Sequence, residues 1–110
     1  MKKSLFAMLA LGALNITTYA GCVSGATAYC SSVEITRIHI SDTGVIRVKT
    51  NGDQTILDCT SAGSNTYLQL PNTNATNALY SFFLTAKTTK SKVTIRVENG
   101  SAGCMIKYAY

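Results

Sequence analysis

The stretch ATNALYSFFLTAKTTKSKVTIRVE, residues 75–98, changes from a helical to a strand period and so decides the fold class. Its first half spaces apolar residues by 3, 1, 3, 1 and 3 positions, which is typical of one helical face. These residues are Ala75, Ala78, Leu79, Phe82, Phe83 and Ala86. In residues 92–98, Val93, Ile95 and Val97 alternate with polar residues, which predicts a strand with these three inward. One amphipathic helix is therefore expected to lead directly into a strand.

Polar residues at both ends of the apolar stripe support the helix. Asn72, Thr73 and Asn74 precede it and offer side-chain oxygens for the N-cap. Lys87 and Lys90 lie near its end, where the helix dipole favours positive charge.

The residues before the helix predict a meander of three antiparallel strands. Residues 31–40 (SSVEITRIHI) are rich in β-branched side chains, and a bulge near Thr36 and Arg37 would turn all their apolar residues inward. Residues 41–44 (SDTG) predict a tight turn, after which residues 45–50 (VIRVKT) form the second strand.

Asn51-Gly52 is the strongest hairpin signal in the chain. It predicts a third strand over residues 54–59 (QTILDC), and a polar stretch then leads to the helix. After the helix and the strand at 92–98, Asn99-Gly100-Ser101 predicts a turn and residues 104–110 (CMIKYAY) a last strand. We therefore expect a mainly β fold of order β-β-β-α-β-β, a small five-stranded OB-fold barrel with one α-helix. A flat open sheet with one helix is the structural alternative.

Residues 1–20 have the layout of a secretory signal peptide. Lys2 and Lys3 are followed by an uncharged apolar run over residues 5–14, and a polar segment then ends at Ala20. The apolar run is too short to span a bilayer as a helix. Cleavage after Ala20 leaves residues 21–110, a single domain that we expect to be periplasmic or secreted, with no integral membrane segment. Lipoprotein processing at Cys22 is the competing interpretation, although the bulky Tyr19 fits it poorly.

All four cysteines follow the expected cleavage point. An even number of cysteines in a short exported chain predicts two disulfides. Three pairings exist, and we favour Cys22–Cys30 as a local loop and Cys59–Cys104 as a long-range tie.

Composition excludes several classes of function. Without Lys2 and Lys3, eight basic residues stand against five acidic ones, a net charge of about +3 that is too weak and dispersed for nucleic-acid binding. No C-x-x-C pair occurs and His39 is the only histidine, so neither a zinc site nor any other cofactor is expected. The acidic residues and His39 form no recognisable catalytic pattern, and we expect the protein not to be an enzyme.

Two segments resemble the B subunits of bacterial AB-type toxins. Residues 77–97 (NALYSFFLTAKTTKSKVTIRV) are similar in layout to the helix and strand of Shiga toxin B. Ser31, Ile35 and His39 have the spacing found in the first strand of pertussis-like B subunits such as those of typhoid toxin and subtilase cytotoxin.

The resemblance implies four ligand positions. In the typhoid toxin B subunit, a Tyr-x-Ser step and a Lys and a Thr beside an Asn-Gly hairpin hold a sialoglycan. The matching residues here are Tyr29, Ser31, Lys49 and Thr55. Their hydroxyl, ammonium and aromatic groups suit a carboxylated sugar.

The resemblance also implies a function and an assembly. It implies a toxin B-type subunit, a ring of five copies that binds a host-surface glycan and that pairs with a catalytic A subunit where one exists. An exported OB-fold inhibitor or interaction module that binds no sugar is the alternative.

Overall fold

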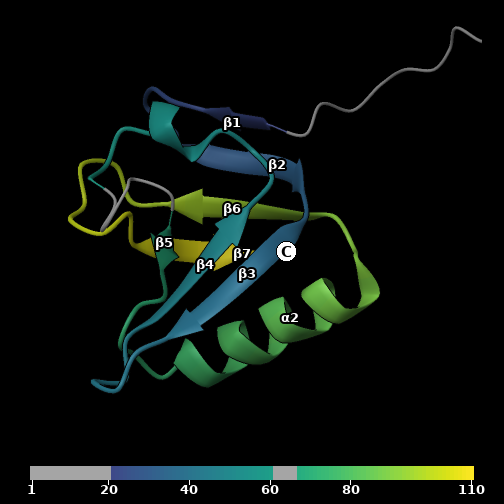
Figure 1. Ribbon diagram of the computed structural model, residues 1–110. Helices are drawn as coiled ribbons and strands as arrows, with labels where there is room; N and C mark the ends of the chain where they lie inside the picture. The colour runs from purple at the N-terminus through teal and green to yellow at the C-terminus, as the bar shows by residue number, and fades with distance from the viewer. Residues whose placement is uncertain (1–20, 61–66) are drawn as a thin grey trace, which may run out of the picture.

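The computed structural model describes residues 21–60 and 67–110, and these form a mainly β structure with one α-helix (Figure 1). The expected signal peptide lies outside the described residues. Within them, seven strands make two antiparallel sheets, of four and three strands. The mainly β class with one helix is therefore confirmed.

The first sheet has the strand order β1-β2-β6-β7, with every neighbouring pair antiparallel. Its strands are β1 (Gly21–Val23), β2 (Tyr29–Val33), β6 (Val93–Val97) and β7 (Ile106–Ala109). Val93, Ile95 and Val97 are buried, as their alternation predicts. The expected last strand is also present, as β7.

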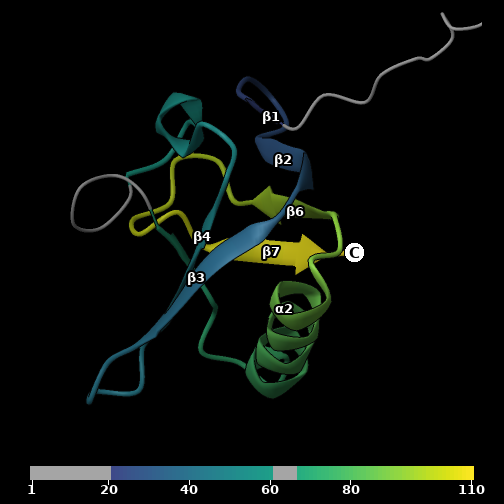
Figure 2. The same cartoon turned by 45° about the vertical axis from the view of Figure 1, so that its right-hand side comes forward.

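The second sheet has the order β3-β4-β5, formed by β3 (Ile35–Ile40), β4 (Ile46–Thr50) and β5 (Leu68–Gln69). The predicted turn at residues 41–44 joins β3 to β4, and the Ser41 amide donates to the Val45 carbonyl at 2.9 Å. The tip of this hairpin projects away from the rest of the molecule (Figures 1 and 2). Ile40, near the tip, is consequently 53% exposed and does not face the core as expected.

The single strand expected over residues 31–40 is wrong, because the chain changes sheets within it. Ser32 has a left-handed backbone with φ of 54°, and the pairing of β2 with β6 shifts register between Cys30 and Val33. β2 therefore ends at Val33, and β3 begins in the other sheet at Ile35. The predicted bulge is present, since the pairing of β3 with β4 shifts register between Ile35 and Arg37.

The third strand expected over residues 54–59 is also wrong. Asn51 does not turn a hairpin; its amide donates to the Glu34 carbonyl at 3.1 Å, and its Oδ1 accepts from the Glu34 amide at 3.0 Å. The buried Oε1 of Gln54 accepts from the Thr50 amide at 2.6 Å, which satisfies a donor that a following strand would have used. Gln54–Ile56 form instead a 3-10 helix, η2, whose first turn Asp53 caps. β5 takes the place beside β4.

These changes leave the sheets open, so the expected five-stranded OB barrel is not formed. On one side, the break between β2 and β3 interrupts continuous strand pairing. On the other side, the described residues connect through isolated bridges, Gln69 with Met105 and Thr60 with Ala102. The result is two packed sheets rather than a closed barrel.

The helix α2 (Thr76–Thr89) packs beside β3 and next to the β7 edge (Figure 2). It buries Phe83 and Ala86, which come from the predicted face. The N-cap is Ala75, which has no side-chain capping hydrogen bond, so the expected capping by Asn72, Thr73 or Asn74 is wrong. The Thr73 hydroxyl oxygen instead accepts from the Ala75 amide at 3.1 Å in the turn before the helix. The core lies between α2 and the two sheets, and its most buried large side chains are Phe83, Leu68, Ile95, Ile106, Val33, Val48 and Val97.

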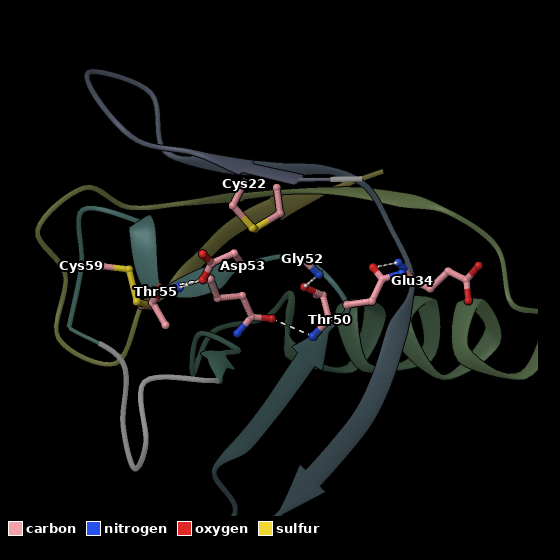
Figure 3. The surroundings of a disulfide bond; sticks show 11 residues. Cys22, Glu34, Thr50, Gly52, Asp53, Thr55 and Cys59 are labelled. Atoms are coloured by element: carbon pink, nitrogen blue, oxygen red, sulfur yellow. Dashed lines mark hydrogen bonds between the residues drawn. A yellow bond between two sulfur atoms is a disulfide. The ribbon is translucent and has the colours of Figure 1, made fainter. Parts of the chain in front are cut away.

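Both disulfides have the favoured pairing. Cys22 and Cys30 are directly opposite in β1 and β2, while Cys59–Cys104 ties the segment after η2 to the residues before β7. Figure 3 shows Gly52 and Asp53 running close beneath Cys22. A Cβ atom on Gly52 would lie 3.0 Å from Cγ1 of Val33 and 3.1 Å from Sγ of Cys22. A side chain at this position would press on both neighbours, which would have to shift by a few tenths of an ångström where the chain passes under this disulfide.

We expect Gly52→Ala to destabilise the protein by about 1–3 kcal/mol, because the added methyl group overpacks a site bounded by two buried side chains. Urea unfolding measures this effect. Gly21→Ala is the matched control, since a Cβ there meets no atom within 4 Å. Equal stability of the two variants would contradict the close approach at Gly52.

The two disulfides are expected to contribute unequally to stability. They close loops with sequence separations of 45 and 8 residues, so chain entropy assigns about 4 kcal/mol to Cys59–Cys104 and about 2.5 kcal/mol to Cys22–Cys30. Unfolding of the two double Cys→Ser variants in urea tests the order. A larger loss for the Cys22–Cys30 pair would show that native-state contacts of β1 outweigh loop closure.

Candidate functional site

The outer face of the first sheet carries a hollow of about 360 Å³. Its volume lies in the range of sites that hold small ligands. The lining residues come from three strands and their flanks: Thr27, Tyr29, Ser31, Thr94, Arg96, Tyr108 and Tyr110.

The alternation of the strands places these side chains on one face. Cys30, Ile95 and Ile106 are at most 1% exposed and point into the core. Successive side chains in a strand point to opposite faces, so the residues beside Cys30 and Ile95 project outward. In β7 a register shift opposite Arg96 and Val97 separates Ile106 from Tyr108, so that Tyr108 and Tyr110, on either side of Ala109, also lie on the outer face. The inward packing of the core therefore fixes which residues line the hollow.

One row of three side chains crosses the hollow. Arg96 on the central strand β6 is the register partner of Tyr29 on β2 and of Tyr108 on β7. Opposite residues on one face of a sheet have Cβ atoms about 4.5–5.5 Å apart. A guanidinium group is thereby flanked by two phenol rings.

A second row lies beside the first. Thr94 and Tyr110 exchange two backbone hydrogen bonds, of 2.7 and 2.9 Å, which hold Tyr110 against β6. The ring of Tyr110 stacks on that of Tyr108 with centroids 6.4 Å apart and planes 17° apart. Both rings face solvent, with Tyr108 47% and Tyr110 72% exposed. They form an aromatic surface at one side of the hollow.

The Arg96 guanidinium has unused hydrogen-bonding capacity. It makes no ion pair or hydrogen bond with any residue in the described part of the chain, and its Nε atom is buried without a partner. Its contact with Tyr108, whose ring centroid is 6.0 Å from Cζ, is a cation–π contact. The terminal nitrogens of the guanidinium also make no hydrogen bond or ion pair with the described residues, so they can donate to an acceptor supplied by a ligand. An anion is such an acceptor.

The four ligand residues implied by the resemblance lie in three places. Tyr29 and Ser31 meet in the hollow. Lys49 is on β4 of the other sheet, opposite Arg37. Thr55 is on η2, where its hydroxyl bonds to Asp53 at 2.5 Å (Figure 3). The structure thus brings two of the four residues together.

Arg96, Tyr108 and Tyr110 are residues of the hollow that the sequence analysis did not identify. A signal exists for Arg96, because once Ile95 and Val97 are assigned to the core, Arg96 must point outward. Tyr108 and Tyr110 reach the same face through the register shift in β7, which alternation does not predict. Their meeting with Tyr29 depends on the order β2-β6-β7, which joins segments more than sixty positions apart in the chain.

Comparisons with protein-family models, with curated proteins and with solved structures found no match to this chain. No helix in the described residues is long and apolar enough to cross a membrane. The same residues contain no cluster of three histidine, cysteine or acidic side chains that could hold a metal ion.

Proposed function

We propose that this protein is an exported glycan-binding subunit of the toxin B type, and that the hollow on the first sheet is its sugar site. The observation that carries the proposal is the row Tyr29–Arg96–Tyr108, in which an Arg without a carboxylate partner lies between two tyrosines. The two disulfides fit an exported protein.

The chemistry of the hollow suits a sugar that bears a carboxylate, such as a sialylated glycan. A guanidinium can bind a carboxylate through two parallel hydrogen bonds. The stacked rings of Tyr108 and Tyr110 offer an apolar surface for the C–H face of a sugar ring. Ser31 and Thr94 add hydroxyl groups that can donate to or accept from sugar hydroxyls.

The proposed assembly is a homopentamer, joined to a catalytic A subunit where the organism encodes one. β1 is the edge strand of the first sheet that lies away from α2 (Figure 2), and such a strand can pair with a neighbouring subunit. A shallow site binds one sugar weakly, and several sites on one ring would raise the overall affinity. Light scattering tests whether the protein is a pentamer in solution. A monomer that also gives no signal on a glycan array would favour the alternative, an interaction module without sugar binding.

We expect Arg96→Gln to lower affinity for carboxylated glycans by roughly 10- to 100-fold, since hydrogen bonds to charged groups contribute about 1.5–3 kcal/mol. A glycan array followed by calorimetry with the best ligand measures the loss. Lys87→Gln is the matched control, because it removes one positive charge from an exposed position on α2, away from the hollow. Equal binding by the two variants would exclude Arg96 as the carboxylate ligand.

Ser31→Ala is expected to abolish glycan binding and to leave the thermal unfolding temperature unchanged. Ser31 lines the hollow, and its hydroxyl makes no hydrogen bond with the described residues.

Two further variants, Lys49→Ala and Thr55→Ala, distinguish a site in the hollow from a site that includes these two more distant residues. If both bind like the wild type, the sugar occupies the hollow alone; if either loses binding while Ser31→Ala does not, the site lies away from the hollow.

A further inference from the structure

The outer face of the β3–β4 hairpin gathers basic side chains in directly opposed pairs. Arg37 is the register partner of Lys49, and His39 is the register partner of Arg47. Ile38 and Val48 on the same strands pack into or against the core, so these four residues point to the opposite side. We call Arg37, His39, Arg47 and Lys49 the basic face.

The like charges on this face are not neutralised. All five acidic residues of the chain lie among the described residues, where the single ion pair joins Glu34 to Lys92. Asp53 is engaged with Thr55 in capping η2. Like charges directly opposite each other destabilise a sheet, so the Arg37–Lys49 pair costs stability without a compensating carboxylate.

Other contacts keep the basic face ordered. Nη1 of Arg37 donates to the Tyr67 hydroxyl at 3.5 Å, and the rings of Tyr67 and His39 lie 5.8 Å apart. Nε of Arg47 is buried and has no partner in the described part of the chain. Two of the four basic side chains, Arg37 and His39, are therefore in contact with Tyr67, and Arg47 has a buried donor without a partner.

We infer that the basic face is a second binding site, and that its ligand is a linear sulfated polysaccharide. Cross-strand partners are about 5 Å apart, and successive outward residues along a strand are about 7 Å apart. Each pair can bracket one anionic group, and a chain carrying a series of sulfates can engage both pairs. Bound sulfates would remove the repulsion that the protein itself leaves in place.

Two other polyanions fit less well. A membrane surface would require an apolar side chain to insert, and the exposed large apolar residues of the described chain lie elsewhere; Ile40, the nearest, points to the opposite side of β3 from His39. Nucleic acid would be held by a larger basic surface than these four side chains in a domain of about +3 net charge. The inference is independent of the sugar site, which lies on the other sheet.

The test uses immobilised heparin as the probe and a pair of variants with equal net charge. The first triple variant, Arg37→Gln/Arg47→Gln/Lys49→Gln, removes the arginine and lysine charges of the basic face. The second, Lys87→Gln/Lys90→Gln/Lys107→Gln, removes three exposed lysines elsewhere. We expect the first triple variant to lose at least about tenfold in affinity and to elute at clearly lower salt, as multiple charge contacts predict. The second should stay within about twofold of the wild type. Equal losses of heparin affinity in both variants would show that heparin responds only to the net charge of the protein, and would overturn the proposed site.

A stability measurement keeps the proposal testable if the triple variant folds poorly. Lys49→Glu converts the repulsive pair with Arg37 into an attractive one, so we expect the unfolding temperature at low salt to rise by about 1–5 °C while heparin binding falls. An unchanged or lower unfolding temperature would show that the face carries no stored repulsion and would overturn the argument.

Competition identifies the ligand class. Dextran sulfate should displace the protein from heparin, and uncharged dextran should not. Stronger binding to phosphatidylserine vesicles or to duplex DNA than to heparin would overturn the polysaccharide assignment. Arg96→Gln should bind heparin like the wild type; loss of binding in that variant would place the polyanion in the hollow and not on the basic face.

Discussion

The burial of one side of β6 is the constraint on which both the core and the hollow depend. Val93, Ile95 and Val97 are each at most 4% exposed, and β6 is paired on both sides, with β2 and β7. A slip of one residue would turn these three side chains to solvent and bury Thr94 and Arg96. The free energy of apolar burial therefore holds Arg96 outward between Tyr29 and Tyr108. No separate interaction is needed to aim the guanidinium.

The left-handed backbone at Ser32 gives the molecule two outward faces of different character. Because β2 ends one residue later and β3 enters the other sheet, Tyr29 and Ser31 before Ser32 line the hollow, whereas Arg37 and His39 after it belong to the basic face. The hollow combines aromatic rings with one cation, whereas the basic face combines several cations with one hydroxyl-bearing ring.

The sequence pattern predicted those elements whose position follows from the periodicity of their own apolar residues. The strands at β4, β6 and β7 and the helix α2 follow from apolar periodicity, and the disulfides join the favoured cysteines. The strand expected over residues 54–59 failed because the buried Gln54 side chain competes for the Thr50 amide. The prediction of a closed barrel failed because closure depends on pairing between strands that are far apart in the chain. The same non-local pairing hid the row through Arg96, although the outward positions of Tyr29 and Arg96 follow from their own strands.

The two candidate binding surfaces also explain why a domain of this size needs its disulfides. A small domain has a net stability of only about 5–15 kcal/mol. The buried Nε atoms of Arg96 and Arg47 and the opposed charges of Arg37 and Lys49 all reduce that margin. Cys22–Cys30 lies on the core side of β2, directly behind Tyr29 and Ser31, and Cys59–Cys104 closes the longer loop. The disulfides thus stabilise the scaffold by constraining its unfolded state. That allows the surface to keep polar groups whose partners the chain itself does not supply.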